Sequence, residues 1–289
     1  NRIWAQHFGQ GMVRTLGDFG SQGDFPSHPE LLDWLAAEFV ASGWDVKALH
    51  RTILNSATYR QSSVTRPEYA EKDPYNRLVH RMGRFRLDAE EIRDNALEVA
   101  GLLSPRIGGP SVMPYQPADF YKGKNEGWPW QVAAGDDLYR RGMYTFWRRT
   151  SPYPTFAIFD APSREECATA RARTNTPLQA LAALNDPAFV EAARVLAERV
   201  MTEGKNSDER LLLLFRKATA RKPTSQEFAV LAGIYERQRK TFAADAKAAQ
   251  ALVKTGNYRP AKGLDVAEHA AWAAVANVVL NLDETITRE

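Results

Sequence analysis

The chain has 289 residues, of which 44% are hydrophobic and 25% are charged, and this composition excludes a largely disordered protein. Its net charge is only +3, from 38 basic and 35 acidic residues that are well mixed, so neither nucleic acid nor an anionic membrane is indicated as a partner. No apolar run approaches the ~18 residues that a membrane span needs. The single cysteine, Cys167, excludes an intrachain disulfide.

The chain opens Asn-Arg-Ile-Trp, without an initiator methionine or the apolar stretch of a signal peptide. We therefore expect it to be a piece of a longer protein. It has no CxxC or CxxCH motif, which excludes a self-contained zinc ribbon and a covalently attached haem. From these patterns we expect neither a metal nor a cofactor in this chain.

Helix-start signals define the first expected elements. Ser27-His-Pro-Glu30 has the form of a capping box and predicts a helix whose apolar residues recur from Leu31 to Val40. Asp45 is placed to cap the next helix. Asp88-Ala-Glu-Glu91 predicts a third helix, with Ile92 the first of its inward residues.

The last third of the chain is typical of alanine-rich helices. Asp186-Pro187 starts a long helix that Gly204 can end, because glycine accepts the left-handed conformation after a last turn. A further helix is expected over residues 211–218. The capping box Thr224-Ser-Gln-Glu227 begins another, and the last runs from about Val266 to Leu280.

Long irregular segments lie between these helices, at residues 8–28, 104–130 and 150–177. Loops of this length are uncommon in compact domains, and their aromatic content argues against disorder. We expect them to be ordered, Gly/Pro/aromatic-rich coil packed on the helices. Only Met143–Arg149 has the character of a short strand.

These patterns predict a mainly α-helical fold with at most a short hairpin. We expect one domain over residues 1–289, in which a coil-rich helical part, 1–185, is covered by a carboxy-terminal helical part, 186–289. The long loops cannot bury themselves, which is why the later helices are expected to pack on them.

Several segments of the chain resemble those of one protein family. They are Phe8-Gly-Gln-Gly11, Pro26-Ser-His-Pro-Glu-Leu-Leu-Asp-Trp-Leu35, Ser56-Ala-Thr-Tyr-Arg-Gln-Ser-Ser63, Gly108-Gly-Pro-Ser-Val112, Phe159-Asp-Ala-Pro162, Arg173-Thr-Asn-Thr-Pro-Leu-Gln-Ala-Leu181, Leu184-Asn-Asp-Pro187 and Leu280-Asn-Leu-Asp-Glu284. The chain resembles the C-terminal planctomycete-specific domain of unknown function, which follows a companion domain, and often a planctomycete-type cytochrome c domain, in large exported proteins.

The resemblance covers nearly the whole chain and implies a setting rather than an activity. It implies a bacterial, exported protein, periplasmic or at the cell surface, with neighbouring domains of the same polypeptide as partners. It also implies that any haem lies in a neighbouring domain and not in this chain.

The most chemically loaded stretch is Asp160–Gln179, with one arginine just upstream. Its candidate ligand-binding residues are Arg149, Arg164, Arg171, Arg173 and Asn175. Arginines with amides suit a carboxylate, sulfate or phosphate, and a threonine can cap the helix expected near Pro177. The alternative, which we favour, is a buried network in which Arg173 pairs with Asp160 or Glu166 and holds the coil in place.

The aromatic residues of segment 104–130 form the second candidate surface. Tyr115, Tyr121, Trp128 and Trp130 offer flat apolar faces that could stack on sugar rings. Residues of this kind more often anchor a long loop by burying themselves.

Other patterns lead to no site. Gly9-Gln-Gly11-Met-Val-Arg14 has arginine where a dinucleotide-binding loop needs its third glycine. Asp18, Asp24 and His28 match no standard metal spacing. Cys167 follows Glu165 and Glu166, which disfavour a thiolate, so we expect a buried and unreactive thiol.

Three functions remain open on this evidence. The chain is a module that packs on and supports its neighbouring domains, which we favour, or it acts on or binds an extracellular anionic polysaccharide between the Arg-rich segment 160–179 and the aromatic loop 104–130. The third hypothesis is an accessory part of a haem redox protein. No paired carboxylates and no nucleophile–base pattern indicate an enzyme.

Overall fold

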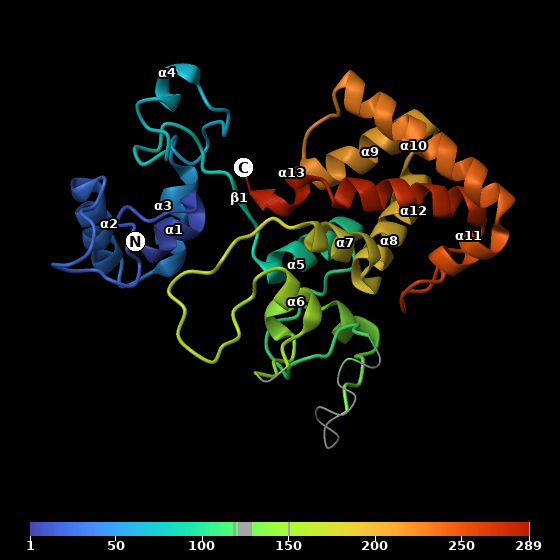
Figure 1. Ribbon diagram of the computed structural model, residues 1–289, viewed down its shortest axis with the longest axis horizontal. Helices are drawn as coiled ribbons and strands as arrows, with labels where there is room; N and C mark the ends of the chain where they lie inside the picture. Colours follow the sequence, from blue (N-terminus) through green and yellow to red (C-terminus); the bar gives the residue numbers. More distant parts are fainter. Residues whose placement is uncertain (118–119, 121–128, 150, 289) are drawn as a thin grey trace. The chain divides into compact units, whose positions relative to one another are not determined.

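The computed structural model in Figure 1 describes residues 1–117, 120, 129–149 and 151–288. Helices make up 52% of it, which confirms the mainly α-helical fold. The chain divides into two compact units. The small unit contains Asn1–Arg86, Cys167–Arg171 and Thr287–Glu289, and the large unit contains Leu87–Glu166 and Ala172–Ile286. That the whole chain folds as one cooperative domain stays a prediction.

The small unit combines short helices with long coil. Its helices are α1 (Arg2–Phe8), α2 (Pro29–Ala41), α3 (Val46–Asn55) and α4 (Pro67–Ala70). Its buried apolar core consists of Trp4, Phe8, Met12, Leu35, Ile53 and Met82. Strand β1 (Phe85–Arg86) pairs antiparallel with β2 (Thr287–Arg288), so this sheet joins distant parts of the chain and is not a hairpin.

The large unit is a helical bundle with coil on one side. Its helices are α5 (Ala89–Ala100), α6 (Pro154–Ile158), α7 (Pro177–Asn185), α8 (Pro187–Glu203), α9 (Ser207–Thr219), α10 (Ser225–Ala244), α11 (Ala246–Val253), α12 (Val266–Leu280) and α13 (Asp283–Ile286), with 3-10 turns at Gly135–Tyr139 and Gly142–Tyr144. Helix α12, red in Figure 1, packs against α8, α10 and α11. Its Trp272 is fully buried and stacks on Tyr235 with ring centroids 4.3 Å apart.

Most helices begin where the side-chain caps predict. Asp45 accepts a hydrogen bond from the Ala48 amide, and Asp186 accepts one from Ala188 at the start of α8. The capping boxes that begin α5 and α10, at Asp88 and Thr224, are both formed. Each cap satisfies backbone N–H groups that a helix otherwise leaves unpaired, which is why these starts could be predicted.

Three local predictions were wrong. Ser27 does not cap α2: His28 is the N-cap residue, and Pro29 occupies the first helical position, where its missing N–H is not needed. Gly204 ends α8 with a φ of −92°, so the helix stops in extended rather than left-handed backbone. The stretch 143–149 contributes only an isolated bridge, between Thr145 and Val112.

The coil of the large unit is held by buried arginine side chains. Arg140 is fully buried, and its guanidinium donates to the carbonyl oxygens of Pro110, at 2.6 Å, and Gly108. The same guanidinium lies over the Tyr144 ring, 3.7 Å from its centroid. Arg93 donates to the carbonyl oxygens of Leu138 and Arg140. These arginine side chains therefore order the described coil of this unit, because they supply hydrogen-bond partners to its backbone carbonyls.

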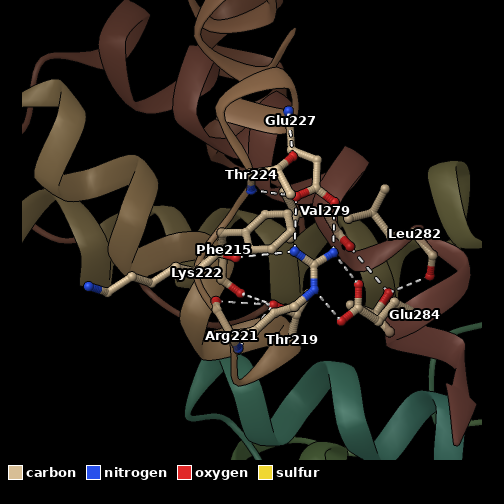
Figure 2. Close-up of polar contacts among 10 residues, drawn as sticks. Phe215, Thr219, Arg221, Lys222, Thr224, Glu227, Val279, Leu282 and Glu284 are labelled. Atoms are coloured by element: carbon tan, nitrogen blue, oxygen red, sulfur yellow. Dashed lines mark hydrogen bonds and ion pairs between the residues drawn. The ribbon is translucent and has the colours of Figure 1, made fainter. Parts of the chain in front are cut away.

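A charged cluster fastens the corner between α9 and α10 to α13. Figure 2 shows Arg221 between two carboxylates, donating to both oxygens of Glu227 at 2.7 and 2.9 Å and to both of Glu284 at 2.7 and 2.8 Å. The guanidinium also lies over the Phe215 ring. Paired bidentate contacts of this kind fix orientation because the planar guanidinium matches the carboxylate geometry.

Candidate functional site

The small unit contains a cavity of about 210 Å³ between α1 with its following turn and the coil that leads into β1. One wall is Trp4 and residues 8–11, and the other comes from residues 75–85. The second wall is part of the cyan coil between α4 and β1 in Figure 1. Two stretches about 65 residues apart in the sequence thus meet around one space.

Glycines allow the two walls to approach closely. Gly9 ends α1 with a φ of +80°, and a Cβ there would lie 2.6 Å from the Phe85 ring. A Cβ at Gly83 would collide with the carbonyl oxygen of Phe8. Gly9 and Gly83 therefore serve close contact between the two walls.

The coil before β1 is held in a strained conformation. Asn76 and Val79 have φ values of 52° and 54°, in the left-handed region that β-branched residues avoid. The Gln61 side chain donates to the Val79 carbonyl oxygen at 2.8 Å, and the Asp73 carboxylate accepts from the backbone N–H groups of Arg77 and Leu78. Strain of this kind persists only where the surroundings over-determine it, and it concentrates at binding and active sites.

Three arginines line the cavity: Arg77, Arg81 and Arg84. The residues lining it include no aspartate or glutamate. Arg77 and Arg81, both half-buried, form no ion pair with any described carboxylate. The Nε of Arg81 is buried and has no hydrogen-bond partner among the described residues. The cavity is therefore lined by cationic side chains, of which Arg77 and Arg81 have no carboxylate partner among the described residues.

The rest of the lining is aromatic and amide. Trp4 and Phe8 stack on each other with ring centroids 4.1 Å apart, and Tyr75, at the other wall, is 77% exposed. Gln10 and Ser27 add uncharged polar groups. The arrangement can hold a small ligand that carries both an anionic group and a ring with an apolar face.

A second cavity, of about 340 Å³, lies between α1, α2 and α3 in the same unit. Apart from Asn1 and Arg2, its lining is apolar, with Leu32, Leu35 and Phe39 among the contributing side chains. It shares Trp4 with the arginine-lined cavity. This cavity can bury an apolar group, but its lining contains no nucleophile or general base.

The residues predicted to bind a ligand in and just before the Arg-rich segment 160–179 lie at the protein surface. Arg149, Arg164, Arg171, Arg173 and Asn175 are all exposed. Arg164 lies over the Trp147 ring, 4.2 Å from its centroid, and Arg173 pairs with Asp88 at 3.6 Å. Asp160, named as a partner for Arg173, accepts hydrogen bonds from Thr174, and the buried Gln179 donates to it at 3.4 Å.

Of the aromatic candidates, Tyr115 and Trp130 help to anchor coil on the large unit. The Tyr115 hydroxyl accepts from the Asn257 backbone at 2.7 Å. Trp130 donates to the Pro114 carbonyl oxygen and stacks parallel to the fully buried Tyr153. Trp128 and Tyr121 lie outside the described residues. Whether any of these residues binds a ligand stays a prediction.

The prediction of a buried Cys167 was wrong, since its side chain is exposed. The surrounding stretch, residues 163–175, is exposed throughout and contains no large apolar side chain that could cover the thiol. Of the residues considered as metal ligands, Asp24 pairs with Arg14 at 3.8 Å and His28 contacts Ser27. No group of three metal-ligating side chains occurs among the described residues.

The large unit holds a buried ionic cluster on α8. Arg194, fully buried, donates to Glu198 at 2.5 Å and lies 3.7 Å from Glu191, and its guanidinium also donates to the carbonyl oxygens of Thr255 and Tyr258. Burial lowers the pKa of the neighbouring His269. These groups line neither cavity described above, and their contacts fasten coil 255–261 to the helices.

The three cavity arginines were missed by the sequence analysis. A signal was present: residues 77–86 contain four arginines and no acidic residue, in a chain whose charges are otherwise mixed. The pattern gives no indication that the glycines after α1 lie opposite these arginines. That relation exists only in the folded small unit.

Comparisons with known proteins give a family but no activity. The family model described as PSD1, protein of unknown function (DUF1553), matches residues 1–235. No curated protein and no solved structure matches the chain. Within the described residues, no helix combines the length and the apolar character that crossing a membrane requires.

Proposed function

The chain belongs to the PSD1 family of proteins of unknown function (DUF1553), and on that premise we propose that it is a binding module whose small unit holds an oxyanion in the arginine-lined cavity. One observation carries the proposal. Arginine donors surround a space without carboxylates, and the buried Arg81 Nε has no protein partner among the described residues. An oxyanion is the ligand that would neutralise Arg77 and Arg81, which no described carboxylate pairs with.

The chemistry of the lining supports binding rather than catalysis. Its residues include no histidine, cysteine or carboxylate, and the histidine that contacts the Ser27 hydroxyl, His28 at 2.9 Å, is not part of the lining. Arginine stays protonated and recognises oxyanions through its planar fork. The module is therefore proposed to retain a ligand that other parts of the protein use.

The resemblance to planctomycete domains supplies the proposed setting. We propose a module of an exported, multidomain protein, placed beside neighbouring domains that include a cytochrome c domain in many relatives. A supporting role for those neighbours is the second candidate, and the apolar cavity between α1, α2 and α3 favours it. Exposed Trp44 and Phe25 in the same unit add apolar surface that a neighbour could cover. An accessory role beside a haem rests on the resemblance alone.

Calorimetric titration of the chain with sulfate, phosphate and acetate at low ionic strength tests the binding proposal. Arg77→Gln and Arg81→Gln remove two of the cavity cations, and Arg51→Gln, at an exposed position of α3, is the matched control. We expect saturable binding by the wild type and by Arg51→Gln, and loss of at least tenfold in affinity in the cavity variants. Equal affinities in all four proteins, or no binding at all, would contradict the proposal.

A further inference from the structure

We propose that the ligand of the arginine-lined cavity is a single acidic sugar residue, a hexuronate or a sulfated hexose, and this proposal rests on the anion-binding function above. Three features of the cavity carry it: its volume, the pairing of aromatic with amide side chains, and the position of both beside the arginines. No residue among the sequence-predicted ligand candidates takes part.

The volume limits the ligand to one ring. Pockets for drug-sized molecules occupy roughly 300–1,000 Å³, whereas this cavity measures about 210 Å³. A nucleotide, which has a base, a sugar and a phosphate, would extend well beyond the enclosed part of such a space. A bare phosphate or sulfate would leave most of it unfilled. One hexose ring with its anionic substituent is the class of ligand that matches.

The walls carry the two kinds of contact that a sugar ring uses. Trp4 and Phe8, each only 7% exposed, stack on each other at one wall, and Tyr75 at the opposite wall, 77% exposed, is the aromatic side chain that offers its ring to a ligand. Aromatic rings accept the apolar C–H face of a pyranose, and the side chains of Gln10 and Ser27 can bond its hydroxyl groups. A simple inorganic anion would use none of these groups.

The arginines decide which sugars bind. Arg77, Arg81 and Arg84 lie around the same space, and Arg77 and Arg81 form no ion pair with a described carboxylate. A neutral hexose would leave the charges of Arg77 and Arg81 without a counter-ion. A carboxylate or a sulfate group presents two oxygens to which one guanidinium can donate two parallel hydrogen bonds. An acidic sugar is therefore favoured over a neutral one and over an anion without a ring.

Calorimetry on the full chain separates these contributions. The probes are glucuronate, glucose 6-sulfate, glucose, acetate and sulfate. We expect each acidic sugar to bind at least tenfold more tightly than the ring-free anion that matches it, and glucose not to bind. Tyr75→Ala should remove most of this advantage while leaving acetate binding unchanged. Phe25→Ala, an exposed aromatic of the same unit outside the cavity lining, is the control and should change neither.

The outcomes distinguish this inference from the function on which it rests. Equal affinity for glucuronate and acetate would overturn the sugar assignment and leave anion binding intact. Absence of binding by every probe would overturn both. Loss of all binding in Arg81→Gln with an unchanged melting temperature supports the anion site, and the advantage of the acidic sugars over the ring-free anions supports the sugar assignment. If that variant fails to fold, Arg77→Gln provides the same comparison.

Discussion

The side chain of Asn76 bonds the backbone of Arg81 in both directions. Its Nδ2 donates to the Arg81 carbonyl oxygen at 2.9 Å, and its Oδ1 accepts from the Arg81 N–H at 3.2 Å. This closed pair sets the loop of residues 76–81, and with it the position from which Arg81 reaches the cavity. The asparagine is also suited to its φ of 52°, which few residues adopt at low cost.

Asn76→Ala should therefore weaken both the fold and the site. Two backbone groups lose their partners and alanine is placed in the left-handed region, so we expect the free energy of unfolding to fall by about 2 kcal/mol. Anion affinity should fall at least tenfold, as measured by calorimetry alongside a thermal melt. The exposed Asn55→Ala is the control. An unchanged affinity would show that the loop does not position Arg81.

Arg194→Ala should strongly destabilise the large unit. The substitution removes the guanidinium that pairs with Glu198 at 2.5 Å. It also removes the positive charge next to the fully buried Glu191. Removing one member of a buried ionic cluster costs about 3–5 kcal/mol. Denaturant unfolding measures the change. Arg216→Ala, at an exposed position of α9, should alter stability by less than about 0.5 kcal/mol.

Asp94→Asn should stabilise the protein at neutral pH. Burial raises the pKa of Asp94 to about 6 from 3.8, although the Gly142 N–H donates to its carboxylate at 2.6 Å. The folded state thus holds the proton more tightly, so this group disfavours folding increasingly as pH rises from 3.8 to 6. An amide oxygen keeps the bond without the charge.

We expect Asp94→Asn to gain about 1–3 kcal/mol at pH 7 and nothing below pH 3.8. Unfolding titrations across that range measure the difference, with Asp208→Asn as an exposed control. A constant difference between wild type and variant at every pH would contradict the assignment of the effect to ionisation.

The Arg221 cluster of Figure 2 should make an acid-sensitive contribution. The Arg221 guanidinium lowers the pKa of Glu227 from 4.5 to about 2, helped by the Thr224 backbone N–H. A depressed carboxyl pKa stabilises the fold above 4.5, and this stabilisation disappears as pH falls through 2. Since the side chains are 34–40% exposed, the contribution is about 0.5–1 kcal/mol.

Glu227→Gln should remove that contribution and flatten the pH dependence of the melting temperature between pH 4.5 and 2. Glu236→Gln, an exposed position on the same helix, should keep the wild-type slope. Identical slopes in both variants would mean that the cluster does not hold the α9–α10 corner to α13.

Local signals explain which parts of the fold the sequence could predict. Caps such as Asp45, Asp88 and Thr224 act within four residues, so each start can be inferred without knowing the tertiary structure. At Ser27 the same rule failed, because Pro29 occupies the first helical position and the N-cap residue is therefore His28. Ion pairs between distant residues cannot be predicted in this way. Arg173 pairs with Asp88, which lies 85 residues away in the sequence, and the contact depends on how the coil folds.

The candidate site depended on relations that sequence patterns do not contain. Val79 occupies a backbone conformation contrary to its intrinsic preference, and tertiary contacts such as the Gln61 bond hold it there. The arginines of residues 77–86 do not by themselves indicate a site, because nothing in the sequence places Gly9, at the end of α1, against Phe85. Conversely, the Arg-rich segment 160–179 drew attention by composition and proved to be exposed coil over residues 163–175.

The measurement that tests the central claim most directly is an NMR titration of the arginine Nε–H signals with sulfate and glucuronate. The Arg81 signal is assigned by its loss in Arg81→Lys, and the exposed Arg51 serves as an internal reference. Anion binding in the cavity predicts a saturable shift of the Arg81 signal that exceeds any shift at Arg51. Equal, non-saturating shifts at both arginines, or none at Arg81, would contradict an anion site in the small unit.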